Sequence, residues 1–337
     1  MKIVVLGGGI STERHVSLVT ATSVCKALRS KGHKAIFVDM FLGLEDYEGT
    51  LEDAFDAPDG FCGDVRIEHV EPDLEKVKEQ RKDKSNSHLG KNVLEICKIA
   101  DCVFLGLHGI DGEDGKIQAA LDLIGVPYTG SGAMGSAIAM DKKMAKKIMR
   151  DAGIPTPSET DCVPCVVKVV NGGSSIGVAV CDTEEEYKAA LEDFKKYNAD
   201  ILVEEKISGT ELTVPVLGDK ALTPIEIVPP GNGTFDYVSK YQSGDEGARE
   251  ICPARISAEA AQLVKDLALK FHKAMNLSVY SRTDFILDEN GKAWCLEVNT
   301  LPGMTPNSLI PKAAKLEGMD YPELCEKIVL LSLDKNN

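Results

Sequence analysis

The chain has 337 residues, too many for one compact hydrophobic core, which predicts two or three domains. A hydrophobic fraction of 43% and a charged fraction of 27% are ordinary for a globular protein, and no apolar run approaches the length of a membrane span. The formal net charge of −15 argues against nucleic acid and membrane as partners. An acidic chain can still bind a nucleotide where lysines are placed locally, so the positions of the lysines matter.

The ten cysteines are scattered, and several lie inside apolar runs, as reduced thiols of cytoplasmic proteins do. The apolar stretch after Met1-Lys2 is too short for a signal peptide, so we expect a cytoplasmic protein. Cys162-Val-Pro-Cys165 is a lone CxxC without a second pair. A redox or zinc role for it is therefore a minor alternative to structural thiols.

The first elements predict a parallel sheet. Residues 2–6 form an apolar strand, residues 16–29 have helical spacing, and residues 34–38 form the next strand, which together make a βαβ unit. The intervening pattern Gly7-x-Gly9-x-x-Thr12 is not the full GxGxxG fingerprint. A nicotinamide-dependent dehydrogenase is therefore a weak alternative.

Residues 41–90 differ in character from what precedes them. They are rich in Asp, Glu and Lys, which predicts an inserted, partly helical surface segment with 74–84 as its most helical part. The first domain then continues with further elements: a helix at 93–100, a strand at 102–105, a loop at 108–115 and a helix at 116–124.

The middle of the chain contains a candidate anion site. A helix is expected over 133–152, ended by Gly153 and Pro155, and strands at 166–170 and 178–180 flank the Gly/Ser loop 171–177. Glycines let backbone N–H groups approach an anion, so this loop predicts phosphate binding, with an ordinary glycine hairpin as the alternative. The remaining expected elements are a helix at 184–194, strands at 201–205 and near 213–228, a mobile loop at 229–250, and helices at 258–275 and 322–333.

A hairpin near the C-terminus predicts a metal site. Strands at 283–287 and 293–296 are joined by an Asp-Glu-Asn-Gly turn, which places Asp284 across from Glu297. Glu297 and Asn299 are two apart on one strand and so share a face. Three oxygen ligands at one place suit Mg²⁺ bridging phosphates, and a hairpin of solvated polar side chains is the alternative.

Motifs spaced along the chain carry a family resemblance. They are Gly8-Gly-Ile-Ser-Thr-Glu-Arg-His-Val-Ser17, Leu107-His-Gly-Ile-Asp-Gly-Glu-Asp-Gly115, Pro127-Tyr-Thr-Gly-Ser-Gly132, Met140-Asp-Lys142, Gly173-Ser-Ser-Ile-Gly177, Lys240-Tyr241, Cys252-Pro-Ala254 and Glu297-Val-Asn-Thr-Leu-Pro-Gly-Met-Thr305. In this order they resemble the D-alanine–D-alanine ligase family, over most of the chain outside residues 41–90. The resemblance implies an α/β fold, α+β in parts, with a three-domain ATP-grasp architecture and an N-terminal parallel sheet. The implied domains are 1–132 with the acidic insertion 41–90, 133–207, and 208–337.

The resemblance also implies which residues bind ATP and metal. Lys142, Lys168 and Lys240 match the phosphate lysines, and Ser174 and Ser175 belong to the loop that covers the phosphates. The other implied ligands are Glu204, Glu205 and Ile207 in the adenine segment, Glu211 at the ribose, and Asp284, Glu297 and Asn299 at two Mg²⁺ ions, with Mn²⁺ as a substitute.

A second set of residues is implied for the substrates. Glu13 matches the carboxylate that holds the first D-alanine, with His108 nearby and with Ser174 and Tyr241 as hydrogen-bonding partners. Arg282 and the backbone of Gly303 match the oxyanion stabilisers, and Ser308 and Leu309 match the segment that receives the second D-alanine.

The implied reaction joins two D-alanines through a D-alanyl phosphate for peptidoglycan precursor synthesis, and the implied assembly is a homodimer. The nearest alternative is the same chemistry with D-serine or D-lactate as second substrate. Related depsipeptide ligases carry histidine where Tyr241 stands, so Tyr241 favours the dipeptide. A non-catalytic nucleotide-binding sensor is an alternative of another class, which the loss of a metal ligand or of Arg282 would have supported. The chain departs from the family pattern at Val169, at Gly172 and in the short segment 155–165, which predicts that one helix is missing.

Overall fold

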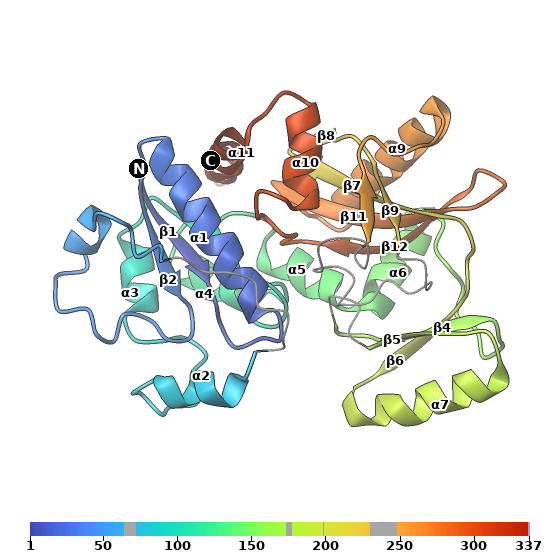
Figure 1. Cartoon of the computed structure of the whole chain (residues 1–337), viewed down its shortest axis with the longest axis horizontal. Coiled ribbons are helices and arrows are strands. Elements are labelled where there is room, and N and C mark those ends of the chain that lie inside the picture. The colour runs from blue at the N-terminus through green and yellow to red at the C-terminus, as the bar shows by residue number, and fades with distance from the viewer. Residues whose placement is uncertain (64–71, 173–176, 198, 230–247, 336–337) are drawn as a thin grey trace. The chain divides into compact units, whose positions relative to one another are not determined.

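A computed structural model of the chain describes residues 1–63, 72–172, 177–197, 199–229 and 248–335 (Figure 1). The chain forms two compact units, each with its own sheets and helices. The first unit comprises Met1–Ala137, Leu277–Ser281 and Thr300–Asn337, and the second comprises Ile138–Asn276 and Arg282–Asn299. This grouping differs from the expected three-domain division in joining residues 300–337 to the N-terminal unit.

The first unit is built on a parallel sheet of order β2-β1-β3, which confirms the α/β prediction. Its strands are β1 (Lys2–Gly7), β2 (Lys34–Asp39) and β3 (Cys102–Leu105). Helix α1 (Arg14–Ser30) connects the first two strands and packs against both (Figure 1). The apolar run Ile3–Leu6 is fully buried, as expected for a central parallel strand covered on both faces.

The rest of this unit is helical and irregular. In its described residues, 41–63 and 72–90, the expected partly helical segment 41–90 contains one short 3₁₀ helix, η1 (Asp53–Asp56), and one α-helix, α2 (Leu74–Gln80). The other helices are α3 (Val93–Lys98), α4 (Lys116–Leu123), α10 (Leu309–Leu316) and α11 (Tyr321–Asp334). Helix α11 packs on α1 and β3, which explains why the C-terminal segment belongs to this unit. Helix α10 was not expected from the sequence.

The single helix expected over 133–152 is wrong. The chain forms α5 (Ala133–Met140) and α6 (Lys142–Asp151), because Asp141 between them takes an extended conformation with φ −89° and ψ 101°. The Asp141 carboxylate accepts a hydrogen bond from the Met144 amide and so caps a new helix. This interruption places Lys142 in the first turn of α6.

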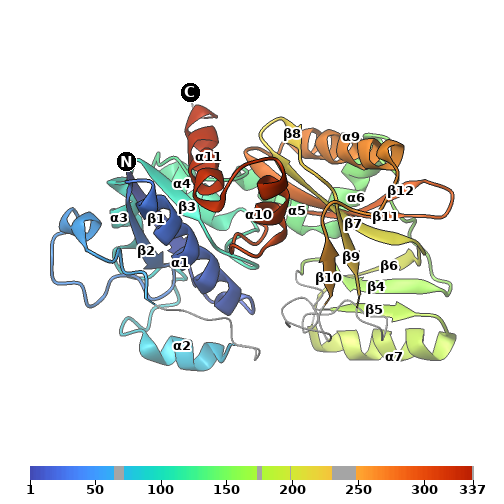
Figure 2. The same ribbon diagram turned by 45° about the horizontal axis from the view of Figure 1, so that its top comes forward.

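Within its described residues, the second unit contains two sheets. The smaller is a sheet of order β5-β4-β6, formed by β4 (Cys165–Val169), β5 (Val178–Cys181) and β6 (Ile201–Glu205). Helix α7 (Glu184–Phe194) covers one face of this sheet (Figure 2). A capping box between Thr183 and Glu186 starts this helix.

The larger sheet has the order β10-β9-β7-β11-β12, with β8 paired to β7. Its strands are β7 (Thr210–Leu217), β8 (Lys220–Ala221), β9 (Ile225–Val228), β10 (Arg249–Ile251), β11 (Tyr280–Leu287) and β12 (Ala293–Asn299). Helix α9 (Ala258–Ala274) packs on β7, β8 and β12, and α6 also contacts β12 (Figure 2). The short segment from Pro155 to Pro164 contains no helix, as expected.

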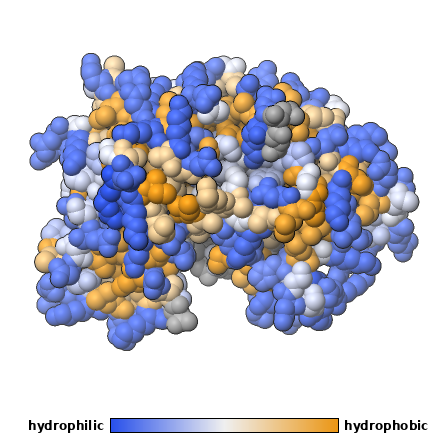
Figure 3. Space-filling model, turned by 180° about the vertical axis from the view of Figure 1, so that it is seen from behind, coloured by the Kyte–Doolittle hydropathy of each residue, from blue (hydrophilic) through white to orange (hydrophobic). Residues whose placement is uncertain are grey.

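Hydrophilic side chains cover much of the face drawn in Figure 3, with hydrophobic side chains in patches between them. Within the part of the chain that the structure describes, no helix is both long and apolar enough to cross a membrane.

Candidate active site

The C-terminal hairpin of the second unit has the expected geometry. In the β11–β12 ladder Asp284 pairs directly with Glu297, and Arg282 pairs with Asn299. Glu297 and Asn299 are half-buried while Val298 between them is buried, so the two polar side chains share the more open face. A register shift between Asp284 and Phe285 interrupts the ladder beside this pair.

Arg282 and Asp284 form a bidentate ion pair. Arg282 Nε lies 3.1 Å from Asp284 Oδ1, and Arg282 Nη2 lies 3.0 Å from Oδ2. The Thr213 hydroxyl on β7 donates a third hydrogen bond, 2.5 Å long, to Oδ1. Arg282, expected to stabilise the oxyanion, is therefore ion-paired with Asp284, expected to bind metal. The two residues are two apart on one strand, so their side chains lie on the same face.

Lys142 lies between the Gly/Ser loop and the hairpin. Its Nζ donates a hydrogen bond of 2.5 Å to the carbonyl of Gly172 and lies 3.7 Å from Glu297 Oε2. The capping by Asp141 fixes the start of α6, and the Lys142 amide also bonds to the Val170 carbonyl. The fold thus brings a predicted phosphate lysine beside a predicted metal carboxylate.

A buried charge cluster supports the second phosphate lysine. Lys168 Nζ on β4 lies 2.9 Å from Glu204 Oε2 on β6, and Lys146 of α6 pairs with the other carboxylate oxygen. Lys146 and Glu204 are each about 1% exposed. These contacts are close ion pairs, but neither Glu204 oxygen has a partner with directional hydrogen-bond geometry. Two ammonium groups share one carboxylate, so the cluster can carry a net positive charge.

Lys146 was missed by the sequence reasoning. It lies four residues after Lys142 on α6, a spacing that places both side chains on one helix face and could have identified it. The Lys146 ammonium donates to the Thr156 hydroxyl at 2.7 Å. Burial lowers the pKa of Lys146 below its ordinary value, while Glu204 opposes that shift.

The expected adenine segment begins in the last two residues of β6 and continues beyond it. Glu205 ends that strand, and its carboxylate accepts a hydrogen bond of 2.9 Å from the Ser158 amide. Ile207 lies in the connection to β7, and Glu211, the second residue of that strand, pairs with Ile227 of β9. The Glu204 side chain points into the lysine cluster.

In the first unit, Glu13 lies next to the loop that carries His108. Glu13 is 8% exposed at the N-cap position of α1, and its amide bonds to the Ser11 hydroxyl. A Cβ on Gly109, which has φ +70°, would lie 2.9 Å from Glu13 Oε2, so this loop approaches the carboxylate too closely for a side chain.

His108 is buried within a network of the same unit. Its Nδ1 lies 3.0 Å from the Leu301 carbonyl, and its Nε2 lies 3.0 Å from the Thr20 hydroxyl. Burial lowers the pKa of His108, but hydrogen bonding and charge from Glu113, with smaller contributions from Glu13 and the Leu301 carbonyl, outweigh burial and raise it overall.

The turn before α10 brings Gly303 next to Ser308. A Cβ on Gly303 would lie 3.1 Å from Ser308 Oγ, and this oxygen accepts a hydrogen bond of 3.1 Å from the Thr305 amide. The Tyr321 hydroxyl donates a bond of 2.6 Å to the Met304 carbonyl and so holds the turn from its other side. Leu309 begins α10 immediately after Ser308.

Four predicted residues, Ser174, Ser175, Lys240 and Tyr241, lie outside the described residues, as does most of the expected loop 229–250. Among described residues, no group of three or more His, Cys, Asp or Glu side chains is arranged to hold a metal. The expected metal set has only two carboxylates and one amide, a donor set that suits Mg²⁺ completed by phosphate oxygens and water.

The comparisons with known proteins decide the family. A model described as D-ala D-ala ligase N-terminus matches residues 2–131, and one described as D-ala D-ala ligase C-terminus matches residues 138–330. A D-alanine–D-alanine ligase of Pediococcus pentosaceus is 41% identical over 344 residues, covering 98% of this chain and 97% of the relative. The chain belongs to the D-alanine–D-alanine ligase family.

Solved structures confirm the expected ATP-grasp architecture of this family member. A D-alanine–D-alanine ligase of Bacillus anthracis complexed with ATP matches with a TM-score of 0.73 and 27% identity, covering 100% of this chain and 99% of that one. The VanG D-Ala:D-Ser ligase of Enterococcus faecalis matches with a TM-score of 0.74 and 29% identity, covering 98% and 99%. The shared fold therefore does not distinguish the second substrate.

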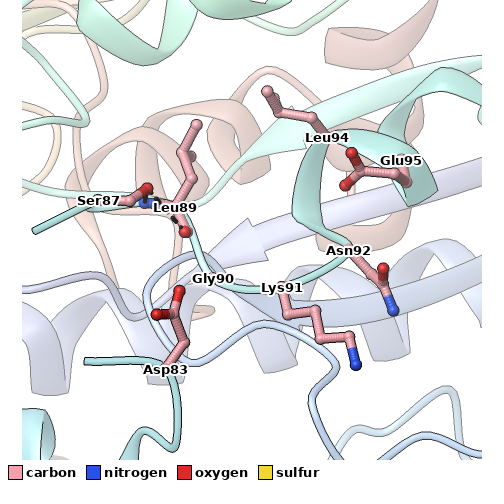
Figure 4. Close-up of a pocket in the computed structure, with 8 residues that line it drawn as sticks. All are labelled: Asp83, Ser87, Leu89, Gly90, Lys91, Asn92, Leu94 and Glu95. Atoms are coloured by element: carbon pink, nitrogen blue, oxygen red, sulfur yellow. Dashed lines mark hydrogen bonds between the residues drawn. The ribbon is translucent and has the colours of Figure 1, made fainter. Parts of the chain in front are cut away.

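One pocket of this ligase-family chain is lined by none of the predicted site residues. Its volume is about 490 Å³, and Figure 4 shows its lining, which comes from the segment that leads into α3: Asp83, Ser87, Leu89, Gly90, Lys91, Asn92, Leu94 and Glu95. The preceding Arg81 is only 1% exposed, lies over the Phe41 ring and donates to the Ser87 carbonyl. His88 in the same segment contacts Asp111 of the loop that carries His108.

Proposed function

We propose that this protein is an ATP-dependent ligase that joins two D-alanines into D-alanyl-D-alanine and releases ADP and phosphate, for peptidoglycan precursor synthesis. The observation that carries the proposal is the match of both ligase models along the chain, from residue 2 to residue 330 apart from a short gap. The three phosphate lysines, the three metal ligands and Arg282 that the family resemblance implies are all present in the sequence. A protein that only sensed nucleotide, without catalysis, would not need all of these residues.

The second unit holds ATP. Lys142, Lys168 and Lys240 offset the phosphate charges, and the Glu204 cluster supports this role because two lysines share its one carboxylate. Asp284, Glu297 and Asn299 would hold two Mg²⁺ ions, which supply charge neutralisation to the phosphoryl group when bound. The open face shared by Glu297 and Asn299 supports this assignment.

The first substrate is activated at its carboxylate. Glu13 binds the ammonium group of the first D-alanine, and its burial strengthens that ion pair. The carboxylate of that D-alanine then attacks the γ-phosphorus of ATP, the bond from this phosphorus to the bridging oxygen breaks, and ADP leaves as D-alanyl phosphate forms. His108, Ser174 and Tyr241 orient this substrate, and exclusion of water protects the acyl phosphate from hydrolysis.

The second D-alanine attacks the acyl phosphate through its neutral amine. Ser308 and Leu309 receive this substrate, and Arg282 with the Gly303 amide stabilises the oxyanion of the tetrahedral intermediate. Arg282 is already oriented by Asp284, which supports a preorganised role. Phosphate then leaves and the dipeptide remains.

Three further assignments belong to the proposal. The protein acts in the cytoplasm as a homodimer, and its chain divides functionally into 1–132, 133–207 and 208–337. Light scattering of the purified protein tests the dimer, because a monomer mass across micromolar concentrations contradicts it.

The decisive experiment offers the purified protein Mg-ATP with D-alanine, D-serine and D-lactate, singly and in pairs. ADP release and product masses are measured together, with L-alanine as the stereochemical control. We expect D-alanyl-D-alanine as the main product. ADP formation without dipeptide, or a main product containing D-serine or D-lactate in equal competition, contradicts the proposal.

A further inference from the structure

Two cysteines from different parts of the first unit meet at one backbone oxygen. Cys25 on α1 and Cys62 in the 41–90 segment both direct their sulfurs at the carbonyl of Gly60, at 3.8 Å and 3.5 Å. Cys25 is fully buried and Cys62 is 7% exposed. The two thiol side chains also contact each other, so the fold places them as a pair for a disulfide after side-chain rotation.

The turn that carries Cys62 is held firmly on α1 and β2. Arg29 of α1 donates to the carbonyls of Ala35, Ala57 and Pro58 at 2.8, 3.0 and 2.7 Å. The Gly60 carbonyl also accepts from the Phe37 amide of β2 at 2.8 Å. The two thiols are therefore positioned by the fold, without reliance on chain flexibility.

The surroundings of the two thiols differ. Contact with the Cys25 thiol lowers the pKa of Cys62, and the charges of Arg29 and Lys26 lower it further against the effect of burial. The contact with Cys62 and burial both raise the pKa of Cys25. Cys62 is therefore the more acidic thiol of the pair and Cys25 the less acidic one, the asymmetry that a nucleophile and its resolving partner require.

We propose that Cys25 and Cys62 form a redox-active dithiol that hydrogen peroxide converts to a disulfide. The Cys62 thiolate attacks one peroxide oxygen, the O–O bond breaks, and hydroxide leaves with a sulfenic acid on Cys62. The Cys25 sulfur attacks the sulfenic sulfur, the S–S bond forms, and the released hydroxide takes the Cys25 proton to become water. The two thiols supply the two electrons that reduce peroxide.

The chain contains a matched internal control. Cys165 and Cys181 are directly paired on neighbouring strands, and both are at most 1% exposed. Burial raises the pKa of both thiols, that of Cys181 to about 11, and nearby acidic side chains add to this effect, while contact with Cys181 only partly offsets the rise at Cys165. If proximity alone decided the rate of oxidation, this pair would react as fast as Cys25 with Cys62. If the rate depends on how readily a thiol loses its proton, only the pair that contains Cys62 should react fast.

The test is graded hydrogen peroxide on the purified full-length protein, followed by alkylation, digestion and mass spectrometry. We expect a Cys25–Cys62 disulfide at least about tenfold faster than a Cys165–Cys181 disulfide, and its loss on adding dithiothreitol. Equal rates for the two pairs, or no bridge between Cys25 and Cys62, overturn the proposal.

Three serine variants assign the roles. Cys25→Ser should leave Cys62 as a sulfenic acid that dimedone traps, while Cys62→Ser should leave Cys25 reduced. Cys97→Ser is the control, because burial raises the pKa of that thiol to about 12 and the bridge should form at the wild-type rate. Oxidation of Cys25 at the wild-type rate without Cys62 overturns the assignment.

Discussion

Arg282 holds both carboxylate oxygens of Asp284 from two positions earlier on the same strand. The two hydrogen bonds orient the Asp284 carboxylate before a metal ion binds. They also hold the Arg282 guanidinium in one orientation. Neither group can be altered without disturbing the other, so variants of this pair must be interpreted together.

Replacing Asp284 by asparagine should lower turnover by at least about 10²-fold, because charge on the transferring phosphoryl group is no longer offset. Asparagine preserves the side-chain size, so the fold should be retained. Steady-state ADP release across a Mg²⁺ series is the measurement, with Thr213→Val as the control that removes only the third hydrogen bond to this carboxylate. Near wild-type turnover of Asp284→Asn at saturating Mg²⁺ would show that the metal assignment is wrong.

Lys146→Met should lower the free energy of unfolding by about 3 kcal/mol, because Glu204 then keeps a buried charge with one partner fewer. Combining it with Glu204→Gln should recover part of that loss in a double-mutant cycle, measured by urea unfolding. The single variant should also raise the KM for ATP, since the cluster loses its surplus positive charge. Additive stability losses in the cycle would contradict the coupling.

Two buried histidines, His108 and His272, should give stability profiles of opposite sign. The pKa of His108 is raised on folding, so its protonation stabilises the protein below about pH 6.5, and this contribution is lost as pH rises through the folded pKa. Burial lowers the pKa of His272 to about 4, so its contribution is complete above pH 6.5 and is lost as pH falls toward 4. Unfolding free energies of wild type, His108→Gln and His272→Gln between pH 4 and 8 test this. Profiles with the same sign for both variants would refute it.

Tyr321→Phe should lower kcat by roughly tenfold while the KM for ATP stays within about twofold, because the lost bond to Met304 loosens the turn that carries the Gly303 amide. The free energy of unfolding should fall by only about 1 kcal/mol. Initial-rate kinetics separate the two parameters, and Tyr187→Phe in the second unit is the matched control. An equal rise in the KM for ATP would indicate a general structural defect instead.

Tyr241 should set the choice of second substrate, a prediction that rests on the sequence alone. A phenol is neutral near pH 7, whereas a histidine there is partly protonated and favours an incoming carboxylate over an ammonium group. Wild type should therefore prefer D-alanine to D-lactate, and Tyr241→His should increase the D-lactate share most at lower pH. Product ratios from competing acceptors across a pH series decide the matter, and an unchanged ratio in the variant would exclude this role.

Local signals in the sequence were enough to predict the hairpin of β11 and β12 and the parallel pairing of β1 with β2. The pairing of Asp284 with Glu297 follows from strand alternation and a short turn, both of which depend on neighbouring residues. The parallel order of β1 and β2 follows in the same way from a strand, a helix and a strand in succession. The break at Asp141 was also a local signal, but continuous helical periodicity on both sides concealed the cap.

Only the tertiary structure decided which charges meet. Lys146, Lys168 and Glu204 come from α6, β4 and β6, and nothing near any of them in the sequence specifies the other two. Arg282 could equally have faced solvent, and Cys25 and Cys62 are far apart along the chain. The sequence determined the elements because these depend on short-range periodicity and capping. Which groups become partners of the buried charges and thiols depended on packing. A buried polar group loses its contacts with water and needs a partner inside the protein, and that partner can come from any part of the chain.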